Sequence, residues 1–286
     1  MTSSQRRIVV AVDRSANARL ALEQAVRRAG PGGELIVAHV VKVLPEPLAK
    51  ALAVSSAYHE IARQLVGQLV ALHAPGAEGV VLEGPVARRL ADLAREREAD
   101  EIVIGSRGLG RFSGALGSVS HALLHQADHP VVVVPAAAAN HPREGHAHGR
   151  CTVVVGYDGS EPARAALAYA AQRSCEGGQI LAVHAYQPVS DWLGWPGYQR
   201  VLDAHQAHGR HLLQSLKEEH DGQLEISLLE GPAARAIVAA ADARDADEIA
   251  IGSRGFGPVR GVVGSVSHAV LHETDRVVTV IPADAL

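Results

Sequence analysis

The chain has 286 residues, a length of about two ordinary domains, and its formal net charge is −4 with no block of like charge. This pattern argues against a nucleic-acid partner or a membrane-surface protein, and no apolar run reaches the roughly 18 residues that a membrane-spanning helix needs. We therefore expect a cytoplasmic protein. Apolar residues make up 47% of the chain and aromatic residues 3%, so its cores must be packed mainly from alanine, valine, leucine and isoleucine.

Short apolar runs alternate with helical patterns through the first half of the chain. The β-branched run from Ile8 to Val12 predicts a buried strand, and Ser15 is placed to cap the helix that follows. Apolar residues at helical spacing in this helix and in the next long one are Leu22, Ala25, Val26 and Ala29, then Ile61, Leu65, Leu69 and Leu72.

Four more strands are predicted over residues 35–41, 79–82, 102–104 and 131–134. Gly84-Pro85 opens a helix, since proline suits the first helical turn, and Gly117-Ser118 opens another. Strands without polar alternation are buried on both sides. The pattern therefore predicts an α/β fold in which helices cover both faces of a parallel sheet.

The second half of the chain repeats the first. The segment "RIVVAVDRS" matches "TVVVGYDGS", and "ADEIVIGSRG" matches "ADEIAIGSRG". Asp13 and Asp158 are 145 residues apart, and Gly105 and Gly252 are 147 residues apart. This period is longer than the roughly 20–50 residues of solenoid repeats, so it indicates a duplicated domain.

The predicted domain boundary lies in a polar segment without apolar periodicity. We predict a first domain over residues 1–136, a linker over residues 137–150 and a second domain over residues 151–286. The linker histidines His141, His146 and His148 are interpreted as solvated, because spacing within a flexible segment fixes no metal geometry. The insertion from Asp191 to Arg200 has no counterpart in the first copy. It is expected to be a surface loop, with a lid or partner contact as the alternative.

A glycine-rich segment follows the fourth strand of each copy, as "GSRGLGRFSGALGSVSHALLH" and "GSRGFGPVRGVVGSVSHAVLH". Its glycines leave backbone amides uncovered, and Gly117-Ser118 begins a helix whose first amides lack intrahelical partners. Such amides at the positive end of a helix form an anion site. The segment lacks the Gly-Lys-Ser/Thr of a Walker A motif, and the dinucleotide fingerprint would follow the first strand instead.

Other residues gather at the same edge of the predicted sheet, where open parallel sheets bind their ligands beyond the carboxyl ends of the strands. Asp13 follows the first strand, Val40 ends the second and Gly105 follows the fourth. The second copy places Asp158, Ala185 and Gly252 in the same way.

Each half resembles the universal stress protein family in its first-strand aspartate, its His-Val or His-Ala pair after the second strand, and its G-x-x-G…G-S segment. The resemblance implies a tandem protein with two five-stranded parallel sheets, strand order 3-2-1-4-5, of the adenine nucleotide alpha hydrolase-like kind. It implies ATP, with or without Mg²⁺, or another adenine nucleotide as the ligand. It also implies pairing of the two repeats through their last strands, and a homodimer is a further assembly that we consider.

The resemblance implies that the aspartate lies near the base, with backbone from the second strand beside it, and that the glycines and serine surround the phosphates and ribose. With two loop arginines added, the predicted nucleotide-site residues are Asp13, Val40, Gly105, Arg107, Gly108, Gly117 and Ser118 in the first repeat, and Asp158, Ala185, Gly252, Arg254, Gly255, Gly264 and Ser265 in the second.

Several of these residues also have structural interpretations. The aspartates contact the ligand, cap the following helix or bond the amides of the loop. The serines bind phosphate, cap a helix or do both. The arginines reach phosphate, form a salt bridge at the rim or lie in solvent. His39 and His184 are predicted to be hydrogen-bonded structural residues rather than catalytic ones. His121 and His268 are expected to pack against the helix or meet solvent.

The glycine segment departs from the family pattern in one respect. The pattern places nine residues between the second glycine and the Gly-Ser pair, whereas this chain has eight in both copies. One residue spans up to about 3.3–3.6 Å, which is comparable with the separation of neighbouring phosphates. The shortened segment is therefore expected to grip a different phosphate or to bind weakly.

The predicted function is nucleotide binding by a stress-response regulator with little or no turnover. No nucleophile–base pair and no paired carboxylates flank the glycine segment, and phosphoryl transfer needs metal ligands and a positioned nucleophile. Two alternatives remain open. One is a slow ATP hydrolase on the same fold, and the other is a nucleotide-independent interaction module whose glycines merely permit tight turns.

Overall fold

The computed structural model divides into two compact units, residues 1–141 and residues 142–286. It describes residues 6–42, 55–106, 116–140, 151–173, 178–187, 195–220, 224–253, 264–282 and 285. Because residues 141–150 lie outside this set, the predicted linker bounds stay a prediction. No helix in the described part of the chain combines the length and apolar character that a bilayer span requires.

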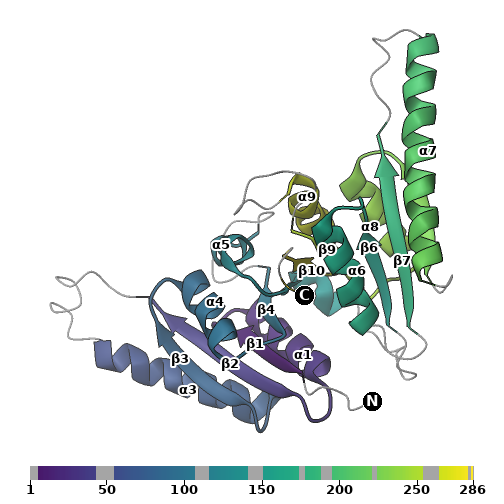
Figure 1. The fold of residues 1–286 in the computed structure, drawn as a ribbon. Coiled ribbons are helices and arrows are strands. Elements are labelled where there is room, and N and C mark those ends of the chain that lie inside the picture. The colour runs from purple at the N-terminus through teal and green to yellow at the C-terminus, as the bar shows by residue number, and fades with distance from the viewer. Residues whose placement is uncertain are drawn as a thin grey trace. The chain divides into compact units, whose positions relative to one another are not determined.

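Unit 1 is a doubly wound α/β domain (Figure 1). Its strands are β1 (Arg7–Ala11), β2 (Glu34–Val41), β3 (Glu78–Glu83), β4 (Glu101–Gly105) and β5 (Val131–Val134). They are parallel and lie in the order β3-β2-β1-β4-β5, which confirms the predicted fold class and strand order.

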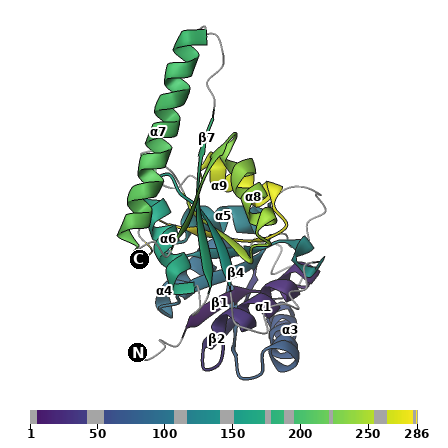
Figure 2. The same ribbon diagram turned by 90° about the vertical axis from the view of Figure 1, so that its right-hand side faces the viewer.

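The helices of unit 1 cover both faces of this sheet. They are α1 (Ala16–Ala29), α3 (Ser55–His73), α4 (Val86–Glu96) and α5 (Ser118–Gln126), followed by the short 3-10 helix η1 (Ala136–Asn140). The helices α1 and α3 lie on one face and α4 lies on the other (Figures 1 and 2). This arrangement follows from right-handed crossovers between parallel strands.

Unit 2 repeats the same topology. Its strands β6 (Thr152–Gly156), β7 (Gln179–Tyr186), β8 (Glu225–Glu230), β9 (Glu248–Gly252) and β10 (Val277–Ile281) lie in the order β8-β7-β6-β9-β10. The helices α6 (Glu161–Arg173) and α7 (Trp195–Glu219) lie on one face of this sheet, and α8 (Ala233–Ala243) and α9 (Ser265–Glu273) lie on the other (Figure 2). The insertion is helical from Trp195 onward, where a loop was predicted, and residues 191–194 lie outside the described part.

The core of unit 1 is built from the central strands, whose side chains are buried on both sides. Val9 of β1 is paired with Ile36 of β2 and with Ile102 of β4, and Val9 and Ile102 have no exposed surface. At the start of α1, the Ser15 hydroxyl accepts a hydrogen bond from the Ala18 amide at 3.1 Å. This confirms the predicted helix cap.

The predicted inner faces of two helices were partly wrong. Val26 of α1 is 38% exposed, and Ile61 and Leu72 of α3 are 44% and 75% exposed. Instead α3 buries Ala62 and Val66 against the sheet. Helix α3 approaches β3 closely here, since a Cβ atom at Gly79 would lie 2.7 Å from the Val66 Cγ1.

A buried ion pair joins α1 to β4 in unit 1. The Arg28 guanidinium donates to both Glu101 carboxylate oxygens, from Nε at 2.7 Å and from Nη2 at 2.8 Å, and both side chains are almost fully buried. In unit 2 the corresponding Glu248 accepts a hydrogen bond from the Thr279 hydroxyl, while the Arg173 guanidinium lies 4.0 Å away. The two copies thus compensate the same buried carboxylate in different ways.

Candidate functional site

The carboxyl ends of β1, β2 and β4 meet at one edge of the unit 1 sheet and bring together the described residues of the predicted site. Asp13 lies two residues beyond the end of β1 and is half-buried. Its Oδ1 accepts a hydrogen bond from the Ser15 amide at 2.8 Å, which shapes the turn into α1. Among the described residues, the hydrogen bond to the Ser15 amide is the one that this carboxylate makes, and it uses Oδ1 alone. The structural and the ligand interpretations of this aspartate are therefore compatible.

The backbone of Val40 faces the same edge. The last backbone hydrogen bond between the β1 segment and β2 runs from the Val12 amide to the Ala38 carbonyl at 2.9 Å. Alternate residues of a strand direct their backbone groups to opposite neighbours. Val40 therefore directs its amide and carbonyl toward the β1 side, just beyond the point where β1 ends.

His39 holds the end of β1 in place. Its Nδ1 lies 2.7 Å from the Val12 carbonyl oxygen, and because a carbonyl only accepts, Nδ1 carries the proton. In unit 2, His184 makes the same bond to the Tyr157 carbonyl at 2.8 Å. These contacts confirm the prediction that both histidines are hydrogen-bonded within the fold.

Gly105 is required by packing, a reason that the sequence did not reveal. A Cβ atom at Gly105 would lie 2.9 Å from the Asn17 Cβ and 3.0 Å from the Asn17 carbonyl oxygen, in the first turn of α1. In unit 2, a Cβ atom at Gly252 would lie 2.6 Å from the Pro162 Cβ and 2.7 Å from its carbonyl carbon. Both glycines let a helix approach the end of a strand closely, whatever their role toward a ligand.

Gly117 closes the base of the glycine segment. Its amide donates to the Ser106 carbonyl at 2.7 Å, and the Ser106 amide donates to the Val134 carbonyl at 2.7 Å. Gly117 is also the N-cap of α5, and it makes no side-chain capping bond. Its amide is therefore engaged inside the protein, and the amides that helix geometry leaves without intrahelical acceptors are those of the next three residues.

The start of α5 is anchored by a residue that the sequence reading missed. Ser118 is the first residue of the helix rather than its cap, and its side chain is exposed. Ser120, two residues later, is buried and donates its hydroxyl proton to the Gly105 carbonyl at 2.9 Å. The second serine of "GSVS" thus fixes the helix against β4 and leaves the first free to meet a ligand.

Unit 2 repeats this geometry at the carboxyl ends of β6, β7 and β9. The Asp158 Oδ1 accepts hydrogen bonds from the Ser160 amide at 2.9 Å and from its hydroxyl at 2.5 Å. The Gly264 amide donates to the Ser253 carbonyl at 2.7 Å, and Ser267 donates to the Gly252 carbonyl at 2.7 Å. Ser265 begins α9 as Ser118 begins α5, and Ala185 occupies the position of Val40.

The two copies differ beneath the glycine segment. In unit 1 the Asn17 amide lies 3.5 Å from the Ser106 hydroxyl. Unit 2 has Pro162 at the position of Asn17, and the buried Ser253 Oγ has no hydrogen-bond partner among the described residues. Burial also raises the pKa of the Tyr157 hydroxyl, so this side chain stays neutral beside Asp158.

Four predicted site residues lie outside the described part of the chain. They are Arg107, Gly108, Arg254 and Gly255. Their assignment to the site stays a prediction.

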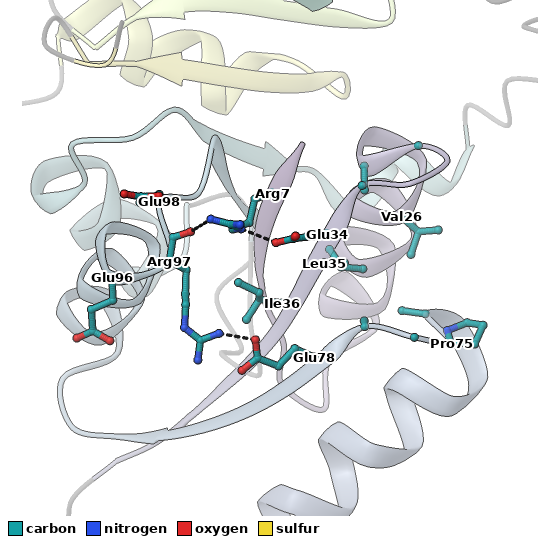
Figure 3. A pocket seen from close by; sticks show the side chains of 16 residues that line it. Arg7, Val26, Glu34, Leu35, Ile36, Pro75, Glu78, Glu96, Arg97 and Glu98 are labelled. Carbon is teal, nitrogen blue, oxygen red and sulfur yellow. Dashed lines mark hydrogen bonds and ion pairs between the residues drawn. The ribbon is translucent and has the colours of Figure 1, made fainter. Parts of the chain in front are cut away.

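A separate cavity of about 720 Å³ lies at the opposite, amino-terminal ends of the strands of unit 1 (Figure 3). Four of its charged side chains form two ion pairs, while Glu96 and Glu98 point away from these pairs. The Arg7 guanidinium donates to the Glu34 carboxylate at 2.5 Å and to the Arg97 carbonyl at 2.6 Å, and Arg97 pairs with Glu78. Because both arginines are paired and Glu96 and Glu98 add negative charge, the cavity does not offer the anion-binding chemistry of the carboxyl edge.

Comparison with known proteins identifies the family. The model of the Universal stress protein family matches residues 5–135 and 150–282. A universal stress protein of Mycolicibacterium smegmatis is 29% identical over 293 residues, which cover 96% of each chain. A universal stress protein of Mycobacterium tuberculosis is 35% identical over 61% of this chain, and the match spans 59% of that relative's length.

A solved structure supports the fold over the whole chain. The crystal structure of a universal stress protein from Archaeoglobus fulgidus matches 97% of this chain and 96% of its own, with a TM-score of 0.63 and 22% identity. Since the family model covers most of both units, the chain belongs to the universal stress protein family, with one copy of the family domain in each unit.

Proposed function

We propose that each unit binds an adenine nucleotide, ATP in particular, beyond the carboxyl ends of its strands. We further propose that this binding regulates the protein and that the nucleotide is turned over slowly or not at all. The observation that carries this proposal is the combination, at one sheet edge, of an aspartate carboxylate, an outward-facing strand backbone and a helix N-terminus. The proposal also rests on membership of the universal stress protein family.

The arrangement suits a ligand with a polar base at one end and an anion at the other. The Asp13 carboxylate and the Val40 backbone provide acceptors and a donor for the base. The amides at the start of α5 face a phosphate group, where the helix dipole contributes about 0.3–1 kcal/mol. Each charge-assisted hydrogen bond from an amide adds about 1.5–3 kcal/mol. Several such bonds are enough to hold a nucleotide without a reactive side chain.

Calorimetric titration of the purified chain with ATP tests the proposal. The double variant Gly117→Ala and Gly264→Ala places a methyl group at the base of each glycine segment. Both glycines have ordinary extended backbone, with φ of −60° and −61°, so alanine fits without strain. We expect ATP affinity to fall at least tenfold. The control Gly67→Ala lies in α3, where an added Cβ meets nothing within 4 Å, and it should bind ATP normally.

The same samples distinguish binding from turnover. Phosphate release is measured with and without Mg²⁺, and we expect no release above the level of the double variant. Clear release that the double variant loses would favour the slow hydrolase. Absence of binding heat, with the chain folded by circular dichroism, would refute nucleotide binding and favour the interaction module.

A further inference from the structure

Two helices carry a pair of histidines that the proposed nucleotide site does not use. They are His121 and His125 in α5, and His268 and His272 in α9. Residues four positions apart lie on the same face of a helix, one turn apart. The residues that these helices bury are at other positions and are serines and aliphatic side chains, so the histidines lie outside the buried core.

The two rings of each pair lie against one another. In α5 the Nε2 atoms of His121 and His125 are joined by a hydrogen bond of 3.4 Å, whose proton a bound metal ion would replace, and the ring centroids are 4.5 Å apart. In α9 the ring centroids of His268 and His272 are 4.4 Å apart, at an interplanar angle of 46°. The same juxtaposition therefore occurs once in each unit.

The nitrogen separation in α5 matches the span of two ligands on one metal ion. Zn–N bonds of about 2.0–2.1 Å at the tetrahedral angle place the two nitrogens about 3.3–3.4 Å apart. Imidazole nitrogen is a ligand that suits zinc, copper and nickel. We propose that each histidine pair is a two-ligand site for a divalent transition metal of the zinc and copper class.

The kind of site follows from its surroundings. Within the described residues, no group of three or more His, Cys, Asp and Glu side chains is placed to hold a metal ion. Two imidazoles leave the other coordination positions to water or a small ligand, unlike the closed four-ligand structural zinc sites. Because His121, His268 and His272 are exposed, the ion can enter from solvent. The site is thus open and exchangeable.

The test titrates the full, tag-free chain with metal in nucleotide-free buffer. Zn²⁺ binding is measured by competition with a chromophoric chelator, and Cu²⁺ binding by electron paramagnetic resonance, where nitrogen hyperfine coupling reports imidazole ligands. We expect H121Q/H125Q and H268Q/H272Q each to remove one ion per chain. The fourfold variant should remove both, and H125Q alone should weaken its site at least tenfold.

The linker histidines provide the competing explanation and the control. The variant H141Q/H146Q/H148Q should keep both ions and the nitrogen coupling. The proposal is overturned if the fourfold variant binds Zn²⁺ like the unmodified chain, or if the linker variant loses the bound metal. Should the fourfold variant fail to fold, H125Q and H272Q decide in its place, since each must weaken one site. No sample contains nucleotide, so the outcome is independent of ATP binding.

Discussion

Replacing Gly252 by alanine tests whether the last residue of β9 is a glycine for packing reasons. The new Cβ would lie 2.6 Å from the Pro162 Cβ and 2.7 Å from the Pro162 carbonyl carbon, whereas favourable carbon contacts are about 3.5–4.0 Å. Gly252 is not among the described glycines with positive φ, so the cost comes from contact alone. The first turn of α6 must move away from the sheet.

The size of the effect follows from two opposing contributions. Overpacking a tight contact costs about 1–3 kcal/mol. The atoms that must move here belong to helix backbone and a proline ring, which are rigid, so we expect a cost in the upper part of this range. Alanine is favoured over glycine inside a strand by about 0.5–1 kcal/mol. The net loss in the free energy of unfolding is therefore about 1–2 kcal/mol.

The assay is urea unfolding of the nucleotide-free chain. Gly105→Ala should cost less than Gly252→Ala, because its added Cβ meets Asn17 at 2.9 Å and 3.0 Å. Gly67→Ala in α3 meets open space and should stabilise the chain by about 0.5–1 kcal/mol, since alanine is favoured over glycine inside a helix. If Gly105→Ala and Gly252→Ala both unfold like the unmodified chain, the packing explanation is refuted, and the glycines are explained by a ligand alone.

Two further predictions concern buried charge. Arg28→Met leaves the Glu101 carboxylate buried without its guanidinium, so the free energy of unfolding, measured in urea, should fall by about 3–5 kcal/mol. Adding Glu101→Leu should restore most of this loss. A loss below about 1 kcal/mol for the single variant would contradict the pairing. Burial lowers the pKa of His129 below its usual 6.5, because the folded protein disfavours the charged imidazole. The stability that depends on neutral His129 is therefore fully present above pH 6.5, and it is lost as the pH falls through the lower folded-state pKa. His129→Gln should therefore flatten the rise of the unfolding midpoint between about pH 5 and 7, and an unchanged slope would count against this explanation.

The fold was predictable because its signals are local. Buried parallel strands appear in the sequence as uninterrupted β-branched runs, and Ser15 marks the start of a helix. Because the domain is duplicated, each of these sequence patterns can be checked against its second copy. Topology then follows from right-handed crossovers. The positions of Asp13 and Val40 at one sheet edge follow from the strand ends alone, so that part of the candidate site was accessible to sequence reasoning.

The remaining features depend on contacts between distant segments. Helix α3 offers two apolar faces, and only its close approach to β3 selects the one with Ala62 and Val66. The need for Gly105 depends on how α1 meets β4, and the burial of Arg28 depends on Glu101, which lies far along the chain. None of these contacts leaves a periodic trace in the sequence.

The exchange of Asn17 for Pro162 has a consequence for the protein as a whole. In unit 1 the Asn17 side-chain amide lies 3.5 Å from the Ser106 hydroxyl, whereas the Pro162 ring of unit 2 has no donor to offer Ser253. The two halves are thus similar but not identical at this edge. If each half binds a nucleotide as proposed, the two sites should differ in affinity, and a titration should show two binding steps.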